Sequence, residues 1–201
     1  MIDHIVYGVH DLDGEVGALA STFGVSPSYG GQHVGLGTAN HLADLGDDAY
    51  LEIIGPDPTQ PPPENARPFN LDRMMSAGVI TWCARVSDLD VTIGQAADAG
   101  FAYTEPQAMQ RRSPGGILSW RLSFPDFENP GGVVPFLIQW DGGVPHPSAS
   151  AAKGLRLASM HGTHPAPGRA EGVLVALGLD LEVRRGPQAG LNVRVATTGG
   201  E

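Results

Sequence analysis

The sequence of 201 residues has little cysteine and no long apolar run. Cys83 is the single cysteine, so no disulfide can form within the chain, which fits a reducing cytoplasm. No apolar run approaches the ~20 residues that a membrane helix needs. Met1 leads directly into a predicted strand, so we expect no signal peptide and a cytoplasmic protein.

Positive charge is also scarce, because 12 Lys and Arg stand against 22 Asp and Glu, for a net charge of −10. A charge of this sign disfavours nucleic acids and anionic membranes as partners. The motifs that cradle phosphates or mark common nucleophiles are missing too, since neither Gly-x-Ser-x-Gly nor Cys-x-x-Cys occurs and no phosphate loop is present. These absences favour a small molecule as the partner.

The chain repeats its own opening. Residues 2–13 and 79–90 each read as a strand that runs into a helix start at an Asp-Leu-Asp triplet, and the triplets align His4 with Thr81 without gaps. A short helix of small residues follows each triplet and ends at a glycine. Such a repeat indicates two copies of one supersecondary unit that share a core and leave a cleft for a small molecule.

Strand and turn patterns extend this repeat into an α+β architecture. The first unit, residues 1–56, reads as β-α-β-β-β, and the second, residues 78–141, repeats that order after a proline-rich connector. Residues 154–197 read as a partial third unit of β-α-β-β beyond a linker at 145–153. We therefore predict paired βαβββ units that form a cupped mixed sheet over residues 1–148, with the partial unit packed on it.

Several phrases within residues 1–148 carry a resemblance to a known family. They are Asp3-His4-Ile5-Val6, Gly30-Gly31-Gln32-His33, Gly37-Thr38-Ala39-Asn40, the run from Tyr50 to Pro58 around Glu52, Trp82 with Arg85, the run from Pro135 to Trp140, and His146-Pro147. With them the chain resembles the glyoxalase-like branch of the vicinal oxygen chelate superfamily, which includes glyoxalases, bleomycin resistance proteins and extradiol dioxygenases. Because that superfamily hosts isomerases, dioxygenases, epimerases, lyases and drug-sequestering proteins, the resemblance implies a fold more sharply than an activity.

The resemblance implies a site on His4 and Glu52, which lie on the first and last strands of the first unit. Imidazole nitrogen and carboxylate oxygen together suit a divalent ion such as Zn²⁺, Mn²⁺, Fe²⁺ or Ni²⁺, which would act as a Lewis acid. The complete superfamily site takes two further ligands from the second unit. There Thr81 matches His4, and either Phe136 or Ile138 matches Glu52. Two ligands are too few for a tight site, so we expect no cofactor, with a divalent metal as the alternative.

Glu52 is a candidate functional residue independently of the resemblance, because it lies in an apolar strand where a carboxylate is costly to bury. We interpret it as a general base, with His4 assisting as an acid or a ligand. The alternatives are a structural ion pair for Glu52 and a satisfied core histidine for His4. His33 and His41 are potential additional metal ligands.

Arginines are the candidates for holding an anionic substrate group. Arg85 shares the strand parity of Thr81, so we expect it to face the cup and to meet Glu52 or the substrate. Arg121 is expected to face the same space. Arg111 and Arg112 read as a solvated pair in a loop near the mouth of the cleft.

Polar side chains on the segment facing Glu52 complete the predicted substrate site. His33, Thr38 and Asn40 are expected to line it, and Asn40 could hold a carbonyl or carboxylate group. Asn and Thr also commonly serve turns by bonding their own backbone. His41 alternates with Asn40, so only one of the two can face the cup, and the resemblance favours Asn40.

Three functions remain open at this point. The first is an enzyme that isomerises, epimerises or cleaves a small, oxygen-rich, anionic molecule. The second is a non-catalytic protein that sequesters a metabolite or a drug in the same cup. The third is a structural homodimer whose cup is filled by its own side chains.

Overall fold

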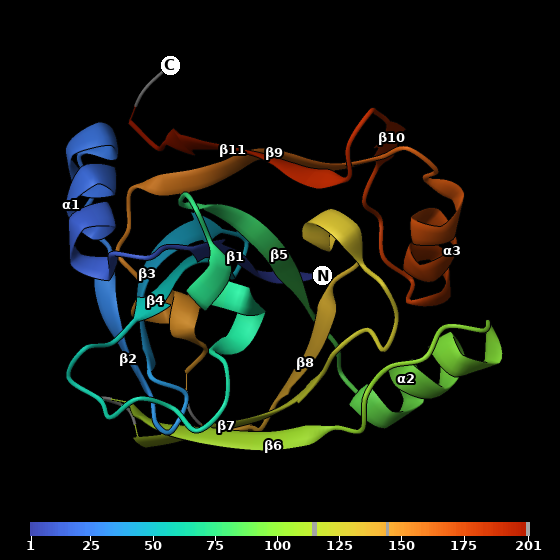
Figure 1. Ribbon diagram of the computed structural model, residues 1–201, viewed down its shortest axis with the longest axis horizontal. Coiled ribbons are helices and arrows are strands. Elements are labelled where there is room, and N and C mark those ends of the chain that lie inside the picture. The colour runs from blue at the N-terminus through green and yellow to red at the C-terminus, as the bar shows by residue number, and fades with distance from the viewer. Residues whose placement is uncertain (114–115, 144, 200–201) are drawn as a thin grey trace.

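A computed structural model describes residues 1–113, 116–143 and 145–199 of the protein. Eight strands form one mixed sheet in the order β2-β3-β4-β1-β5-β8-β7-β6, and three more form a second sheet in the order β10-β9-β11 (Figure 1). The elements of the first unit are β1 (Ile2–Gly8), α1 (Leu12–Phe23), β2 (Ser28–His33), β3 (Thr38–Gly46) and β4 (Ala49–Pro56). Those of the second are β5 (Gly78–Arg85), α2 (Leu89–Asp98), β6 (Gln107–Ser113), β7 (Gly116–Ser123) and β8 (Phe136–Trp140).

The partial third unit contains β9 (Leu155–His164), α3 (Gly168–Ala176), β10 (Val183–Arg185) and β11 (Gly190–Thr197). Its sheet lies on the outer face of the large sheet, where β9 contacts β3 and β11 contacts β5. Short 3₁₀ segments occupy Pro68–Arg73, Pro130–Gly132 and Pro147–Ala149. The predicted fold class, paired βαβββ units with a partial βαββ unit, is confirmed.

Strand register relates the two units by a pseudo-two-fold axis. The central strands β1 and β5 are antiparallel, with His4 opposite Cys83 and Val6 opposite Thr81. The sequence repeat makes His4 equivalent to Thr81, and Val6 equivalent to Cys83. Exchanging the two units therefore turns the pair His4–Cys83 into the pair Thr81–Val6, as a two-fold axis requires. Glu52 lies beside Val6 in the first unit, and Phe136 lies beside Cys83 in the second. Phe136, rather than Ile138, therefore stands at the position of Glu52.

The helices α1 and α2 begin directly after the first aspartate of each Asp-Leu-Asp triplet, at equivalent residues. The Asp11 carboxylate accepts from the Gly14 N–H at 3.1 Å, and the Asp88 carboxylate accepts from the Val91 N–H at 3.0 Å. Each satisfies one of the free N–H groups that start a helix. Gly24 ends α1 with a left-handed φ of 67°, which glycine adopts without steric cost.

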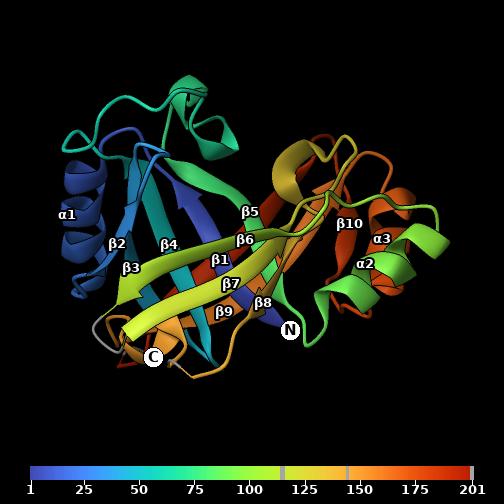
Figure 2. The ribbon, with the colours of Figure 1, turned by 90° about the horizontal axis from the view of Figure 1, so that it is seen from below.

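Alternation along the strands separates an outer core from an inner one. Ile5, Trp82 and Leu137 point outward into the core under the helices and the third unit, whereas their neighbours Val6, Cys83 and Phe136 point into the cup. The sheet curls until the edge strands β2 and β6 approach each other. Figure 2 shows β6 and β7 passing across the strands of the first unit. The curled sheet thereby encloses a cavity on its inner face.

The structure corrects two local predictions. The segment with Arg111 and Arg112 is not a loop, because β6 pairs antiparallel with β7 along its whole length. The segment after Pro145 is more than a linker, because Pro147 and Ser148 are buried against the sheet. No helix in the described part of the chain is long and apolar enough to cross a membrane.

Candidate functional site

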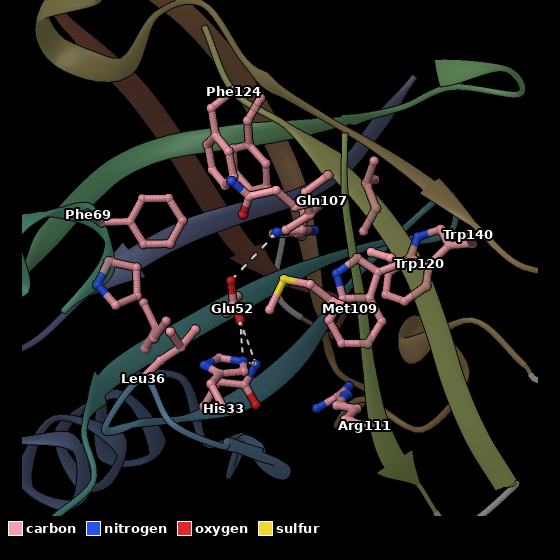
Figure 3. A pocket seen from close by; sticks show the side chains of 18 of the residues that line it. His33, Leu36, Glu52, Phe69, Gln107, Met109, Arg111, Trp120, Phe124 and Trp140 are labelled. Atoms are coloured by element: carbon pink, nitrogen blue, oxygen red, sulfur yellow. Dashed lines mark hydrogen bonds and ion pairs between the residues drawn. The ribbon is translucent and has the colours of Figure 1, made fainter. Parts of the chain in front are cut away.

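The curled sheet encloses a cavity of about 320 Å³ on its inner face (Figure 3). That volume is near the lower end of the range for small-molecule sites. Most of its wall is aromatic or aliphatic, and polar groups are few. Its polar lining residues are His4, His33, Asn40, Tyr50, Glu52, Gln107 and Arg111. The cavity therefore suits a ligand that is apolar over most of its surface, with its polar atoms placed at particular points.

Glu52 lies on β4 in the wall of this cavity and is 8% exposed. Its Oε1 accepts from the Asn40 Nδ2 at 2.5 Å and lies 3.7 Å from the His33 Nε2. Its Oε2 lies 3.6 Å from the His4 Nε2. The neighbours of Glu52 along the strand, Leu51 and Ile53, are buried in the outer core. The carboxylate is thus held in place by amide and imidazole groups rather than by an arginine.

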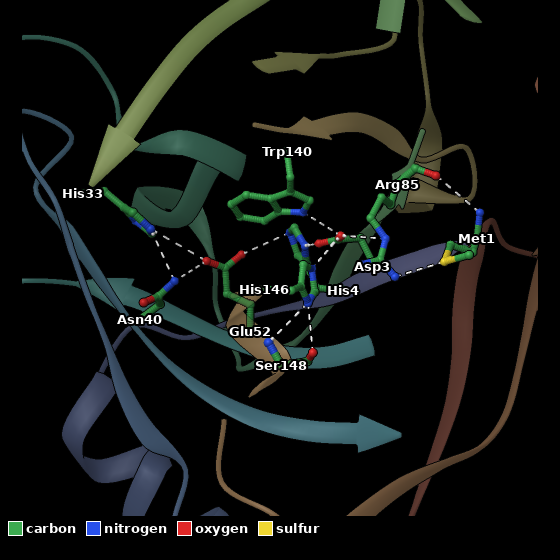
Figure 4. Close-up of polar contacts among 10 residues, drawn as sticks. All are labelled: Met1, Asp3, His4, His33, Asn40, Glu52, Arg85, Trp140, His146 and Ser148. Carbon is green, nitrogen blue, oxygen red and sulfur yellow. Dashed lines mark hydrogen bonds and ion pairs between the residues drawn. The ribbon is translucent and has the colours of Figure 1, made fainter. Parts of the chain in front are cut away.

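His4 is oriented by a buried carboxylate behind it (Figure 4). The Asp3 Oδ1 lies 2.7 Å from the His4 Nδ1, and the Asp3 Oδ2 lies 2.9 Å from the His146 Nε2. Trp140 donates its Nε1–H to the same Oδ2 at 2.8 Å. Burial raises the pKa of Asp3, but the hydrogen bonds with His146 and His4 outweigh it and hold that pKa well below its usual range. An ionised Asp3 can only accept, so the His4 Nδ1 is the donor.

His33 is fixed from the other side of Glu52. Its Nδ1 lies 3.0 Å from the Thr38 Oγ1, and its Nε2 lies 3.3 Å from the Asn40 Nδ2. Burial lowers the pKa of His33, which favours the neutral ring. A neutral Nε2 that accepts from Asn40 leaves the proton on Nδ1. Thr38 therefore supports His33 and does not itself line the cavity.

Two predicted substrate-binding arginines lie outside the cavity, so their placement in the cup was wrong. Arg85 lies at the end of β5, where its Nε is 3.8 Å from the Asp3 Oδ2 and its Nη2 is 3.0 Å from the Met1 Sδ. Arg121 points to the opposite face of the sheet and forms a bidentate pair with Asp90 on α2, at 2.6 and 2.8 Å. Parity along a strand predicted the face for Arg85 but not its distance from the cavity.

Arg111 is the arginine that lines the cavity. It extends from β6 and donates its Nη1–H to the Gly30 carbonyl oxygen on β2, across the gap between the two edge strands. Sequence reasoning placed it in a solvated loop, but Gln107–Ser113 forms a strand although it lacks the β-branched residues typical of strands. The strand forms through pairing with β7.

His146 is a second residue that sequence reasoning did not assign to the site. It comes from the segment after the second unit and reaches Asp3, while its ring lies against Tyr50 and Trp140. The only signal was the phrase His146-Pro147 in the family resemblance. His41, in contrast, faces away, with its Nδ1 3.2 Å from the Pro27 carbonyl oxygen.

The residues present do not fit the four-ligand metal site that the resemblance implies. Thr81 matches His4, but its Oγ1 donates to the Gly132 carbonyl oxygen at 3.3 Å. Phe136 matches Glu52 and has no ligand atom. Among the described residues, Asp3, His4 and Cys83 place three potential ligand atoms within 4.8 Å of one another. However, burial raises the pKa of the Cys83 thiol well above its usual value, and both Asp3 oxygens already accept hydrogen bonds.

One solved structure has the same fold over nearly the whole of this chain. A hypothetical protein from Staphylococcus aureus superposes with a TM-score of 0.70 at 14% identity, over 99% of this chain and 92% of that chain. Methylmalonyl-CoA epimerase from Mycobacterium tuberculosis gives 0.48 at 18% identity, over 74% of this chain and 91% of that chain. The Streptomyces coelicolor epimerase in complex with 2-nitronate-propionyl-CoA gives 0.49 at 23% identity, over 70% and 97%. At these identities the likeness concerns the fold alone.

Sequence comparison identifies the family. No curated protein matches the chain. The family described as glyoxalase-like domain matches residues 2–178, which include both βαβββ units and reach through α3 of the third. Together with the sheet order and the paired units, this match confirms the resemblance inferred from the phrases around His4, Asn40 and Glu52, and the chain belongs to the glyoxalase-like domain family of the vicinal oxygen chelate superfamily.

Proposed function

We propose that this protein binds a small metabolite in the cup and moves a proton at a carbon next to a carbonyl group, with Glu52 as the base. The observation that carries the proposal is the position of the Glu52 carboxylate, in an apolar cavity and within 3.6 Å of the His4 Nε2. A base in such a cavity is shielded from water, which strengthens its electrostatic interactions with a bound molecule. Isomerisation, epimerisation and some eliminations begin with this proton transfer.

His4 is the second group in the proposed transfer. Since its Nδ1–H is committed to Asp3, the Nε2 is the ring atom that faces Glu52 and can exchange a proton with it. A proton taken by Glu52 from carbon can pass to this Nε2, and the Asp3 carboxylate then stabilises the imidazolium. Returning the proton to the opposite face of the same carbon completes an epimerisation, whereas delivering it to a different atom of the delocalised carbanion completes an isomerisation.

Asn40 sets the orientation of the base. Its Nδ2 lies within hydrogen-bond distance of both Glu52 and His33, whereas its Oδ1 is buried with no partner among the described residues. A buried carbonyl without a partner costs roughly 1–3 kcal/mol. That cost supports a functional reason for Asn40, because a purely structural position would be better served by a residue without the unpaired oxygen.

Exchange of substrate hydrogen for solvent deuterium tests the proposal directly. Wild-type protein is incubated in D₂O with 2-oxobutyrate, phenylpyruvate or 1-phenylpropan-2-one, and loss of the signal of the C–H next to the carbonyl is followed by NMR. We expect catalysed exchange for at least one compound and a fall of about 10²-fold or more in Glu52→Gln, the usual scale for loss of a general base. Glu171→Gln on exposed α3 is the matched control and should keep the wild-type rate. Equal rates in the two variants would refute the role of Glu52.

A second function is favoured by the mainly apolar wall of the cavity. A protein that only sequesters a small molecule needs an apolar pocket and no base. In that case a bound compound would raise the melting temperature of wild type and of Glu52→Gln equally, and no exchange above the uncatalysed rate would occur for any of the three compounds.

A further inference from the structure

Two groups of aromatic side chains line opposite sides of the cavity. Phe124 and Phe136 stack with ring centroids 5.1 Å apart and an interplanar angle of 16°, and Phe69 lies against both, at 6.4 and 5.8 Å. Trp120 and Trp140 form the other group, with centroids 5.3 Å apart. Figure 3 shows Phe69 and Phe124 on one side of the space and the two tryptophans on the other, with Glu52 and Met109 between them. The space between these groups is bounded by aromatic rings on two sides.

Phe69 is held in this wall against the preference of its backbone. Its φ is 58°, in the left-handed region that bulky residues rarely adopt. The preceding turn is tied down by Arg67, whose Nε–H donates to the Gly37 carbonyl oxygen at 2.9 Å. A strained residue that persists in a binding cavity points to a functional reason for its position. Here the strain places an additional ring over the cavity.

Arg111 supplies the only Lys or Arg side chain among the described lining residues. A guanidinium has five N–H donors, and among the described residues only the Gly30 carbonyl oxygen accepts from it. No carboxylate in the described part of the chain lies within 4.0 Å of it. A Cβ at Gly31 would lie 3.2 Å from the Arg111 Nη1, so the glycine leaves room for the guanidinium. The cavity therefore offers unused donors in a fork that matches a carboxylate.

We propose that the ligand class of this cavity is a flat aromatic ring bearing a carboxylate. The ligand ring lies between the side of the cavity with Phe69 and the side with Trp120. There a flat ring can form stacked and edge-to-face contacts that stabilise the bound state. The carboxylate binds Arg111 in a bidentate manner, and the carbon between ring and carboxylate lies toward Glu52. The reaction of this ligand rests on the proposed proton transfer. Its binding does not, because binding requires only the aromatic sides of the cavity and Arg111.

The test measures binding of three small probes by quenching of the cavity tryptophans. Phenylacetate carries both features, phenylacetamide lacks the charge, and cyclohexylacetate lacks the aromatic ring. For wild type we expect phenylacetate to bind at least ten-fold more tightly than phenylacetamide, and several-fold more tightly than cyclohexylacetate. Arg111→Met should weaken phenylacetate at least ten-fold and leave phenylacetamide unchanged. Arg121→Met, which removes an arginine outside the cavity, is the matched control and should bind like wild type.

A second variant tests the aromatic side separately from the charge. Phe69→Leu keeps the apolar volume but removes the ring, so phenylacetate should bind roughly two- to ten-fold more weakly while cyclohexylacetate is unaffected. Equal binding of phenylacetate and phenylacetamide by wild type would overturn the inference. So would equal effects of Arg111→Met and Arg121→Met.

The binding test and the deuterium-exchange test address separate hypotheses, so one can fail while the other succeeds. If the probes follow the expected order but no compound exchanges deuterium, the ligand class stands and the proton transfer is refuted. If 2-oxobutyrate exchanges in a Glu52-dependent manner while phenylacetate does not bind, the proton transfer stands and the aromatic ligand class is refuted.

Discussion

Asp3→Asn is the substitution that most directly tests how the site is held together. Asp3 is fully buried and accepts from the His4, His146 and Trp140 side chains. Asparagine keeps the shape but replaces one oxygen by an NH₂ donor. Its remaining oxygen fits best at the position of Oδ2, where two donors meet. The NH₂ group then faces the His4 Nδ1, which must become an acceptor, so the proton of His4 moves to Nε2.

The expected loss of stability follows from these bonds. The bond with His4 is replaced by a neutral one in the reverse direction, and the other two also become neutral, so each of the three falls to about half of its roughly 1.5–3 kcal/mol. The total expected loss is therefore about 2–4.5 kcal/mol. For a chain of this size, each kcal/mol lowers the melting temperature by roughly 2–4 °C, so we expect a fall of roughly 4–18 °C.

Urea unfolding followed by far-UV circular dichroism at pH 7 measures the loss, and ¹⁵N-detected histidine spectra report the tautomer of His4. Asp90→Asn removes an exposed carboxylate paired with Arg121 and is the control, with little change expected in the unfolding midpoint. A loss below about 1 kcal/mol for Asp3→Asn, together with an unchanged His4 tautomer, would show that Asp3 does not orient His4.

Three further predictions concern pH, metal and backbone. Burial lowers the folded-state pKa of His33 below 6.5, so its stabilising contribution is present above that pH and is lost as pH falls. The free energy of unfolding should therefore rise more steeply between about pH 5 and 7.5 in wild type than in His33→Asn, whereas His10→Asn, on the exposed surface, should keep the wild-type slope. Elemental analysis of protein purified without chelator should find well under one equivalent of transition metal, because the second unit offers no imidazole or carboxylate at the matched positions; a full equivalent would contradict this. Gly132→Ala should cost at least about 2 kcal/mol in urea unfolding, because Gly132 has a φ of 62° and a Cβ there would lie 2.0 Å from the Ile80 carbonyl oxygen, whereas Gly78→Ala meets nothing within 4 Å.

The sequence predicted the fold well because its signals are local and repeated. Strand alternation and the Asp caps recur in both units, so each copy supports the interpretation of the other. The placement of His4 and Glu52 in the cup came from the family resemblance, and alternation along the strand extended the argument to Arg85. Arg85 shows the limit of that argument, since parity fixes a face of the sheet but not how far along the strand the cavity extends.

The residues missed by sequence reasoning depend on long-range pairing. Arg111 enters the cavity only because β6 pairs with β7 and the sheet curls until β6 approaches β2. His146 reaches Asp3 across most of the length of the chain. Neither relation leaves a periodic signal near the residue itself, so Arg111 was interpreted as a solvated loop residue and His146 received no role.

Duplication of the backbone without duplication of the side chains explains the character of the cavity. The first unit contributes the polar side, from His4, Asn40 and Glu52, whereas the second contributes the aromatic side around Phe136. Because Phe136 occupies the position equivalent to Glu52, the same residue both removes a metal ligand and adds an apolar wall. An apolar wall opposite a carboxylate and an imidazole lowers the dielectric around them, which favours proton transfer between side chain and ligand. The asymmetry between the units is therefore what we expect if proton transfer by side chains stands in place of Lewis-acid chemistry.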